Sequence, residues 1–114
     1  MILQHFDKYN LFAKKNYGQN FIINPSIIEN IINLSDITKD DYVIEIGPGI
    51  GALTEALVQV AYEVHAFEID KDLEKVLTTE ITNSNFHLYI KDFLKVNLNE
   101  LINSFDNHKT TLPV

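Results

Sequence analysis

The stretch YVIEIGPGIGALTEAL (Tyr42–Leu57) joins an apolar run to a cluster of three glycines and then to a helical pattern. Its first five residues are mostly β-branched or aromatic, which predicts a buried strand. After the glycines, hydrophobic residues recur at helical spacing, at Leu53, Ala56, Leu57 and Val60. A glycine-rich turn between a strand and a helix is typical of a loop that holds a ligand. The stretch therefore predicts a strand, a binding loop and a helix, in that order.

Two further strands are predicted downstream. EVHAFEI (Glu63–Ile69) and FHLYI (Phe86–Ile90) are short runs rich in β-branched and aromatic residues. TTLPV (110–114) has the pattern expected at the beginning of a fourth strand. Helical patterns lie between the strands, and this alternation is typical of a parallel sheet with helices on its faces. The sequence therefore predicts an α/β protein of the doubly wound, Rossmann-like type.

The helices carry recognisable start signals. NPSIIENIINL (24–34) begins with Asn24 as the predicted N-cap and Pro25 at the first helical position. Asp70 is the predicted N-cap of a second helix, and NLNELINSF (Asn97–Phe105) predicts a short third one. The predicted buried stripe of the first helix consists of Ile27, Ile28, Ile31 and Ile32.

Length and composition bound the possible functions. With 114 residues, 46% of them hydrophobic, the chain can form one small domain with a packed core. A net charge of −7 argues against a free-standing nucleic-acid binder, because contacts to phosphates need lysine and arginine. Cysteine is absent from the sequence, which excludes disulfides and thiolate metal sites. No apolar run approaches the length of a membrane span, so we expect a cytoplasmic protein.

The chain divides into two predicted parts. Residues 1–23 lack a clean hydrophobic period and contain the basic cluster KKNYGQN (14–20), so we expect an N-terminal basic or lid segment there. Residues 24–114 form the predicted Rossmann-like domain. A sheet that stops at Val114 is cut in the middle of its pattern, since parallel strands are normally covered on both sides. We therefore expect a truncated sheet and a chain that is a piece of a longer protein.

The glycine loop admits two kinds of ligand. Gly47 allows a sharp turn after the strand, and Gly49 and Gly51 allow the backbone to approach a ligand without a Cβ in the way. The loop also satisfies the looser dinucleotide fingerprint, G-x-G-x-x-A. Glu68 lies about twenty residues further on, at the end of the second strand, where a ribose-binding carboxylate belongs. A dinucleotide and S-adenosylmethionine both remain possible at this point.

Glu45, two residues before Gly47, favours the methyl donor. A dinucleotide places its anionic pyrophosphate over this turn, and a nearby carboxylate would repel it. S-adenosylmethionine has a cationic sulfonium and ammonium and no phosphate, so an acidic rim suits it. Pro48 points the same way, because it removes one backbone N–H that a phosphate could use. We therefore expect Glu45 to line an acidic rim above the first turn.

Asp92 completes a row of three acids. It follows the third predicted strand, as Glu45 and Glu68 end the first and second, and parallel strands bring these ends to one edge. A single acid at a strand end is most often a helix cap or a solvated loop residue. Three of them beside a glycine loop predict a binding site, in which Asp92 is suited to the amino group of adenine.

With these residues, the sequence resembles the ribosomal RNA adenine N6-dimethyltransferase family. The resemblance rests on KKNYGQNFIINPSII, VIEIGPGIGALTEAL, FEID and KDF, which occur in this order and cover Lys14–Val114. The block YGQNFI before the first helix is the specific part, because generic methyltransferases lack it. The resemblance implies the class I S-adenosylmethionine-dependent methyltransferase fold and S-adenosylmethionine as the cofactor.

The resemblance also implies roles for individual residues. Asn20 and Ile22 would contact the methionine end of the cofactor, and Gly47 would form the loop beneath it. Glu45 would act on the methionine portion, Glu68 on the ribose hydroxyls and Asp92 on the adenine amino group. Phe93 is a candidate for packing on the adenine ring, with core filling as the equal alternative. The full set of expected cofactor-binding residues is Asn20, Ile22, Glu45, Gly47, Gly49, Glu68, Ile69, Asp92 and Phe93.

The implied reaction is transfer of the sulfonium methyl to N6 of adenosines in small-subunit (16S) ribosomal RNA, repeated to give dimethyladenosine. Catalysis would consist mostly of positioning donor and acceptor. The family's acceptor motif, of the Asn-Leu-Pro-Tyr type, has no match before Val114, and neither has its C-terminal helical domain. We therefore expect no catalytic residue in this chain, which should bind cofactor without transferring methyl groups.

Several alternatives remain open at this stage. Within the family, an erythromycin-resistance methylase of the large subunit competes with the small-subunit enzyme, and a mitochondrial transcription-factor relative is a further possibility. Outside the family, the rivals are a fragment of a NAD-dependent oxidoreductase and a binding module without catalysis. No metal site is expected, because the histidines are scattered without ligand spacing, at His5, His65, His87 and His108.

Overall fold

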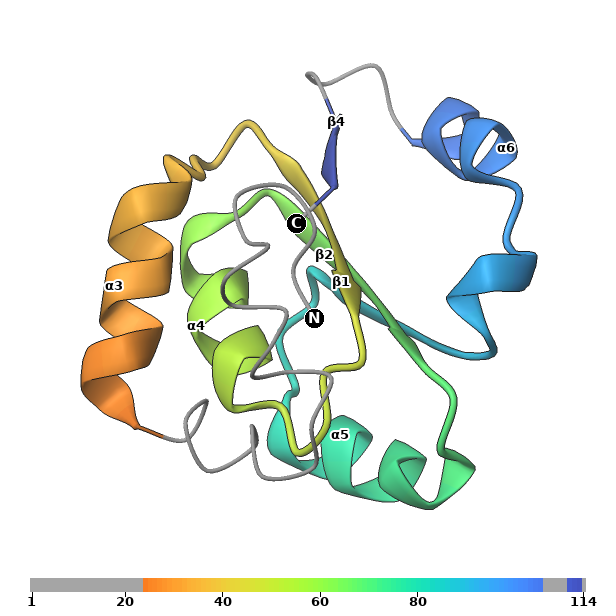
Figure 1. The fold of residues 1–114 in the computed structure, drawn as a ribbon, viewed down its shortest axis with the longest axis horizontal. Helices are drawn as coiled ribbons and strands as arrows, with labels where there is room; N and C mark the ends of the chain where they lie inside the picture. The colour runs from red at the N-terminus through yellow and green to blue at the C-terminus, as the bar shows by residue number, and fades with distance from the viewer. Residues whose placement is uncertain (1–23, 106–110, 114) are drawn as a thin grey trace.

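The computed structural model describes residues 24–105 and the backbone of residues 111–113 (Figure 1). Asn20, Ile22 and the rest of the 1–23 segment lie outside the described residues. The division into a 1–23 segment and a 24–114 domain therefore stays a prediction. Among the described helices, none combines the length and the apolar character needed to cross a lipid bilayer.

The described strands form one parallel sheet. They are β1 (Tyr42–Ile46), β2 (Glu63–Glu68), β3 (Phe86–Ile90) and β4 (Thr111–Pro113), in the spatial order β3-β2-β1-β4. All four predicted strands are confirmed, although β2 ends one residue earlier than expected. The chain builds outward from β1 to β3 and then returns to the other side of β1. This reversal is the topological switch point, beside which doubly wound sheets bind their ligands.

The α-helices are α3 (Pro25–Ser35), α4 (Ala52–Val60), α5 (Glu74–Glu80) and α6 (Leu98–Ser104), and two 3-10 turns, η1 (Lys71–Leu73) and η2 (Phe93–Lys95), precede α5 and α6. Asn24 caps α3 as predicted, because its side chain accepts a hydrogen bond from Ser26 N at 2.9 Å. Asn97 caps α6 in the same way. Asp70 caps the η1 turn, so the second predicted helix begins with a 3-10 turn and becomes α-helical only at Glu74.

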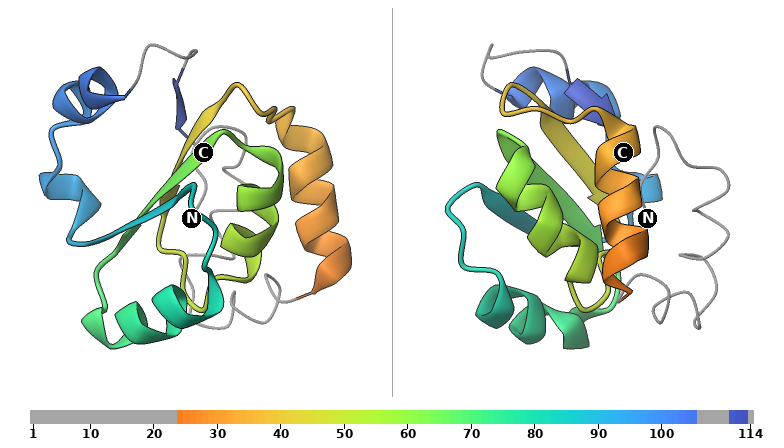
Figure 2. Two further views of the ribbon diagram at one scale, coloured as in Figure 1. Left: turned by 180° about the vertical axis from the view of Figure 1, so that it is seen from behind. Right: turned by 90° about the vertical axis from the view of Figure 1, so that its left-hand side faces the viewer.

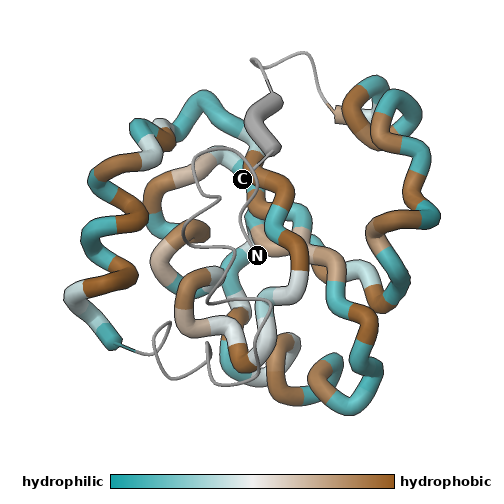
Figure 3. Tube along the Cα trace, viewed as in Figure 1, coloured by the Kyte–Doolittle hydropathy of each residue, from teal (hydrophilic) through white to brown (hydrophobic). Residues whose placement is uncertain are grey.

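One face of the sheet carries the main hydrophobic core. Helix α4 packs on β2, α3 packs on α4, and α5 packs on β3 (Figures 1 and 2). Hydrophobic and hydrophilic residues alternate along α3 in Figure 3, as expected for a helix with one buried side. Of the predicted stripe, Ile31 is buried and the other three isoleucines are partly buried against the core. The fully buried side chains of this core include Val43, Leu57, Val64 and Leu77.

The opposite face of the sheet is aromatic, and α6 lies on that side (Figures 1 and 2). Tyr42 stacks on Phe105, which ends α6, with the ring centroids 4.4 Å apart. Phe67 stacks on Tyr89 at 4.6 Å. Tyr42 and Phe67 are buried, whereas Tyr89 is only half-buried, because β3 is the edge strand of the described sheet. The two faces therefore differ in chemistry, aliphatic toward α4 and aromatic toward α6.

Candidate functional site

The glycine loop lies between β1 and α4, at the carboxyl ends of the strands. Gly47, Gly49 and Gly51 all have positive φ angles, of 71°, 61° and 89°. Side chains adopt this left-handed region at a cost, so the loop conformation selects glycine. Two backbone hydrogen bonds fix the loop: Gly47 N donates to Phe67 O at 2.8 Å, and Gly51 N donates to Pro48 O at 2.9 Å.

Glu68, at the end of β2, ties this loop to the next strand. One carboxylate oxygen accepts a hydrogen bond from Gly49 N at 3.1 Å, and the other accepts one from Asp70 N at 2.9 Å. The side chain is buried, with 6% of the residue exposed. A carboxylate offers about four acceptor positions. The described residues use two of them, and a ribose diol presents two donors for the others.

The loop amides are poorly suited to a pyrophosphate. The N–H groups of Gly47, Gly49 and Gly51 already donate to acceptors within the chain, and Pro48 has none. A dinucleotide site needs such amides to face the ligand. Moreover, the acceptor of the Gly49 amide is itself a carboxylate, which would repel a phosphate bound over this amide. This geometry argues against the dinucleotide alternative more directly than composition does.

Gly51 has a different structural role from the one predicted. A Cβ built on it would lie 2.8 Å from Ile81 Cδ1 and 3.0 Å from Leu77 Cδ2. The close neighbours of Gly51 are therefore side chains at the end of α5, and the expectation that it clears space for a ligand is corrected. Gly51 lies one residue before Ala52, the third position of the fingerprint, and it allows α5 to pack closely against the loop.

The structure also corrects the prediction for Glu45. This residue does not line an open acidic rim, because it is only 1% exposed and its carboxylate accepts a hydrogen bond from Thr54 Oγ1 of α4 at 2.5 Å. Burial raises the pKa of the Glu45 carboxyl above its ordinary value, the hydrogen bond from Thr54 opposes that rise, and the Glu68 carboxylate adds to it. An exposed charge at Glu45 therefore does not select the methyl donor.

The raised pKa of Glu45 predicts a pH-dependent stability. The folded chain holds this proton to a higher pH than the unfolded chain, so the stabilisation is complete below the ordinary pKa of 4.5 and is lost as the pH rises through the folded-state value. Glu45→Gln keeps an oxygen for Thr54 and cannot ionise. We expect the variant to gain free energy of unfolding over the wild type as the pH rises, measured by urea unfolding between pH 4 and pH 8.

Glu55→Gln provides the matched control, because Glu55 is an exposed acid on the same helix as Thr54. Its unfolding curve should run parallel to that of the wild type across this range. A Glu45→Gln curve that also runs parallel would show that Glu45 ionises alike in the folded and unfolded chains.

Asp92 and Phe93 follow β3 at the same edge of the sheet. The Asp92 carboxylate accepts a hydrogen bond from Leu94 N at 2.9 Å and so caps the η2 turn. Phe93 is half-buried and meets Phe67 edge-on, with centroids 5.2 Å apart. Ile69, the residue after Glu68, is 72% exposed. Each of the three acids thus has a structural hydrogen bond, and Ile69 supplies an open apolar surface beside them.

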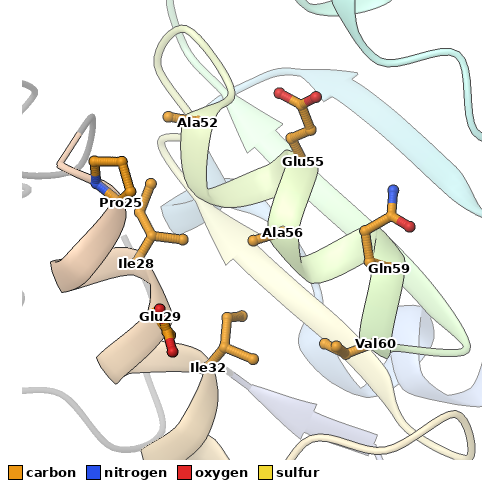
Figure 4. A pocket seen from close by; sticks show the side chains of 9 residues that line it. All are labelled: Pro25, Ile28, Glu29, Ile32, Ala52, Glu55, Ala56, Gln59 and Val60. Carbon is orange, nitrogen blue, oxygen red and sulfur yellow. The ribbon is translucent and has the colours of Figure 1, made fainter.

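An apolar groove of about 500 Å³ lies between α3 and α4 (Figure 4). Ile28 and Ile32 line it from α3, and Ala56 and Val60 line it from α4. The cofactor-binding residues that are expected within the described part of the chain are not among its lining residues. The groove is therefore separate from the predicted site at the strand ends.

The structure brings together residues that the sequence pattern had set apart. His65 of β2 and His87 of β3 are register partners, and Glu63 lies two residues before His65 on the same face. The expectation that these histidines are scattered is therefore wrong for this pair. The sequence shows that Glu63 and His65 lie two residues apart on one strand. Only the pairing of β2 with β3 shows that His87 lies beside them. Thr54, the partner of Glu45, was also missed.

The chain matches the family model described as "Ribosomal RNA adenine dimethylase" over residues 10–114. It is 47% identical over 104 residues to the ribosomal RNA small subunit methyltransferase A of Clostridium botulinum (strain Okra / Type B1), which covers 90% of this chain and 38% of that protein. It is 46% identical over 97 residues to the protein of the same name from Mesoplasma florum, with coverages of 85% and 36%. The chain thus spans about two fifths of the length of these relatives.

Solved structures show the same relationship. The crystal structure of the 23S rRNA methyltransferase ErmE has a TM-score of 0.61 and 32% identity, over 65% of this chain and 31% of that one. A dimethyladenosine transferase from Plasmodium falciparum has a TM-score of 0.57 and 29% identity, over 77% and 30%. The fold is that of the class I methyltransferases, as predicted. By sequence and by structure, the chain belongs to the ribosomal RNA adenine dimethylase family.

Proposed function

We propose that this chain is the S-adenosylmethionine-binding part of an enzyme that dimethylates N6 of adenosines in small-subunit ribosomal RNA. The observation that carries the proposal is the glycine loop fastened to Glu68 at the switch point of the sheet. The amides of its three glycines serve the chain's own acceptors, so the loop favours a ligand without phosphates. The family membership supports the choice of reaction.

In the proposed complex, the ribose hydroxyls donate to the two remaining acceptor positions of Glu68. Adenine lies beside the exposed Ile69, with Phe93 at its edge and the Asp92 carboxylate accepting from its amino group. The methionine end crosses the loop at Gly47 and Gly49. Asn20 and Ile22 stay in the proposed set by resemblance.

Glu45 has an indirect role in this proposal. It is buried beneath the loop, so it attracts the cationic methionine portion through space instead of touching it. Burial raises the pKa of Glu45, and a cation bound nearby would oppose that rise and favour the ionised carboxylate. In the proposed site, the Glu68 carboxylate contacts the ligand directly, and the buried Glu45 carboxylate attracts the cationic methionine portion from a distance.

The chemistry divides between cofactor and chain. S-adenosylmethionine supplies an activated methyl group on its sulfonium. The residues of this chain bind and orient the donor: Glu68 fixes the ribose, and the loop at Gly47 and Gly49 sets the distance of the methionine portion from the sheet edge. Such positioning accounts for much of the rate gain in transfers that need no covalent enzyme intermediate.

The small subunit is the preferred substrate, because the relatives with 46–47% identity carry that name. The large subunit is the second candidate, and the structural match to ErmE at 32% identity supports it. Since the proposed substrate is ribosomal RNA, we place the whole protein in the cytoplasm with the ribosome as its partner.

Calorimetric titration tests the cofactor proposal. We expect the 114-residue chain to bind S-adenosylhomocysteine at one site and to show no saturable binding of NAD. The physical reason is that the amides of Gly47, Gly49 and Gly51 already donate within the chain and Pro48 has no N–H to offer a pyrophosphate. Saturable binding of NAD without binding of S-adenosylhomocysteine would overturn the proposal and restore the oxidoreductase alternative.

A further inference from the structure

The aromatic face of the sheet contains a second cluster of polar side chains that the proposed function does not use. Glu63 and His65 lie on β2 and His87 on β3, and each offers one ligand atom to a common point. These three atoms lie within 4.8 Å of one another. Glu45 and Glu68 belong to the other face, toward α4, so this cluster is separate from the proposed cofactor site.

The distances within the cluster match those of a metal-ligand set. His65 Nε2 lies 2.9 Å from Glu63 Oε1, and His87 Nε2 lies 3.7 Å from Glu63 Oε2. In a tetrahedral zinc site with bonds of about 2.0–2.2 Å, neighbouring ligand atoms are roughly 3.4 Å apart. The two distances involve different oxygens of Glu63, and the full set, with one ligand atom per residue, lies within 4.8 Å, so small side-chain rotations bring the three atoms to this spacing. Two histidines and one carboxylate are a familiar zinc set that leaves a fourth position open.

A buried ring nitrogen of His87 lacks a hydrogen-bond partner among the described residues. Its ring is 40% exposed, yet the Nε2 atom is buried and has no hydrogen-bond partner among the described residues. A buried nitrogen without a partner costs free energy. The ring stacks on His65, with centroids 4.5 Å apart and planes at 13°. Both imidazoles therefore present an edge to the space beside Glu63.

His65 is held in an orientation suited to ligation. Its Nδ1 lies 2.8 Å from the Tyr89 hydroxyl oxygen. Phe105 packs against the imidazole ring, with the two ring centroids 4.5 Å apart. When Nδ1–H donates to Tyr89, the Nε2 lone pair is free for a metal, which is the usual arrangement around a ligating histidine.

We propose that Glu63, His65 and His87 bind one divalent transition-metal ion of the zinc class, with Tyr89 as a positioning residue. The ion joins β2 to β3 on the face covered by α6 and takes the place of the contact between His65 Nε2 and Glu63 Oε1. It satisfies the buried Nε2 of His87. Nitrogen-rich ligands select Zn²⁺, Ni²⁺ or Cu²⁺ over Mg²⁺ and Ca²⁺.

The experiment is a titration of the metal-free 114-residue chain with ZnCl₂ and, separately, MgCl₂, followed by calorimetry and by the unfolding temperature. We expect one Zn²⁺ per chain, an unfolding temperature that rises with Zn²⁺ concentration, and no response to Mg²⁺. His87→Ala and Glu63→Gln should each weaken Zn²⁺ binding by about 10-fold or more. His87 is half-exposed, so its substitution should leave the folded chain intact.

Two further variants separate ligation from general effects. Glu80→Gln removes an exposed carboxylate at the end of α5 and should leave the Zn²⁺ affinity unchanged. Tyr89→Phe keeps the stacked ring and removes the hydroxyl, and it should weaken binding by about 10-fold while the stoichiometry stays at one. The proposal is overturned if Zn²⁺ does not bind at one site, or if His87→Ala and Glu63→Gln bind it as tightly as the wild type.

Discussion

Replacing Glu68 with Gln is expected to weaken binding of S-adenosylhomocysteine by about 100-fold or more. The estimate follows from the proposed contacts, since a hydrogen bond to a charged group contributes roughly 1.5–3 kcal/mol and the ribose diol makes two of them. An amide has one oxygen, and the Gly49 or Asp70 amide must compete for it with the ribose. Calorimetry of the wild type and the variant measures the difference.

Glu68 also supports the fold, so loss of affinity alone does not establish contact with ribose. A 2′-deoxy analogue of S-adenosylhomocysteine separates the two roles. The wild type should lose affinity when the 2′-hydroxyl is absent, whereas Glu68→Gln should bind the two ligands almost equally, because the partner of that hydroxyl is already gone. Glu80→Gln, an exposed acid elsewhere on the chain, should behave as the wild type does.

Equal losses from the deoxy substitution in the wild type and in Glu68→Gln would show that Glu68 supports the loop without touching ribose. That result would remove Glu68 from the cofactor set and leave the zinc proposal intact, because Glu63, His65 and His87 lie on the other face of the sheet.

Local sequence patterns were sufficient for the elements and their order. β1 has the predicted boundaries because Tyr42–Ile46 is a β-branched and aromatic run that ends at Gly47. Asn24 and Pro25 mark the beginning of α3 through chemistry that acts within one turn, a side-chain cap and a fixed φ angle. Signals of this range depend little on the rest of the fold, so they can be read without it.

The orientation of Glu45 was predictable in part. Side chains of a strand alternate between faces, so Glu45 shares a face with Val43, which packs in the α4 core. The expectation of an open rim considered its distance from the glycines along the chain and neglected this alternation. Its hydrogen bond to Thr54 additionally requires the position of α4 relative to β1, which no local pattern contains.

The pairing of His65 with His87 illustrates what local patterns lack. The two residues are separated by a helix and a turn, and only the register of β2 with β3 places them side by side. A shift of one residue in that register would turn His87 to the opposite face. The same dependence on packing applies to Gly51, whose neighbours come from the end of α5.

Gly51→Ala should destabilise the fold by about 2–5 kcal/mol, the largest effect on stability expected among these variants. Two costs add: a left-handed φ of 89° penalises any Cβ by about 1–2 kcal/mol, and overpacking against the core costs about 1–3 kcal/mol. The contact is severe, since the new Cβ would lie 2.8 Å from Ile81 Cδ1 and 3.0 Å from Leu77 Cδ2. Urea unfolding monitored by circular dichroism measures the change.

A double-mutant cycle with Ile81→Val isolates the steric part, because this substitution deletes the Cδ1 atom that the new methyl group would strike. Alone, Ile81→Val should cost about 1 kcal/mol as an ordinary core truncation. In the Gly51→Ala background it should cost nothing or restore stability, with a coupling of about 1 kcal/mol or more. Recovery stays partial, since the φ strain and the Leu77 contact persist. Strictly additive losses would mean that the backbone conformation alone demands glycine at this position, and that the approach of α5 to the loop does not.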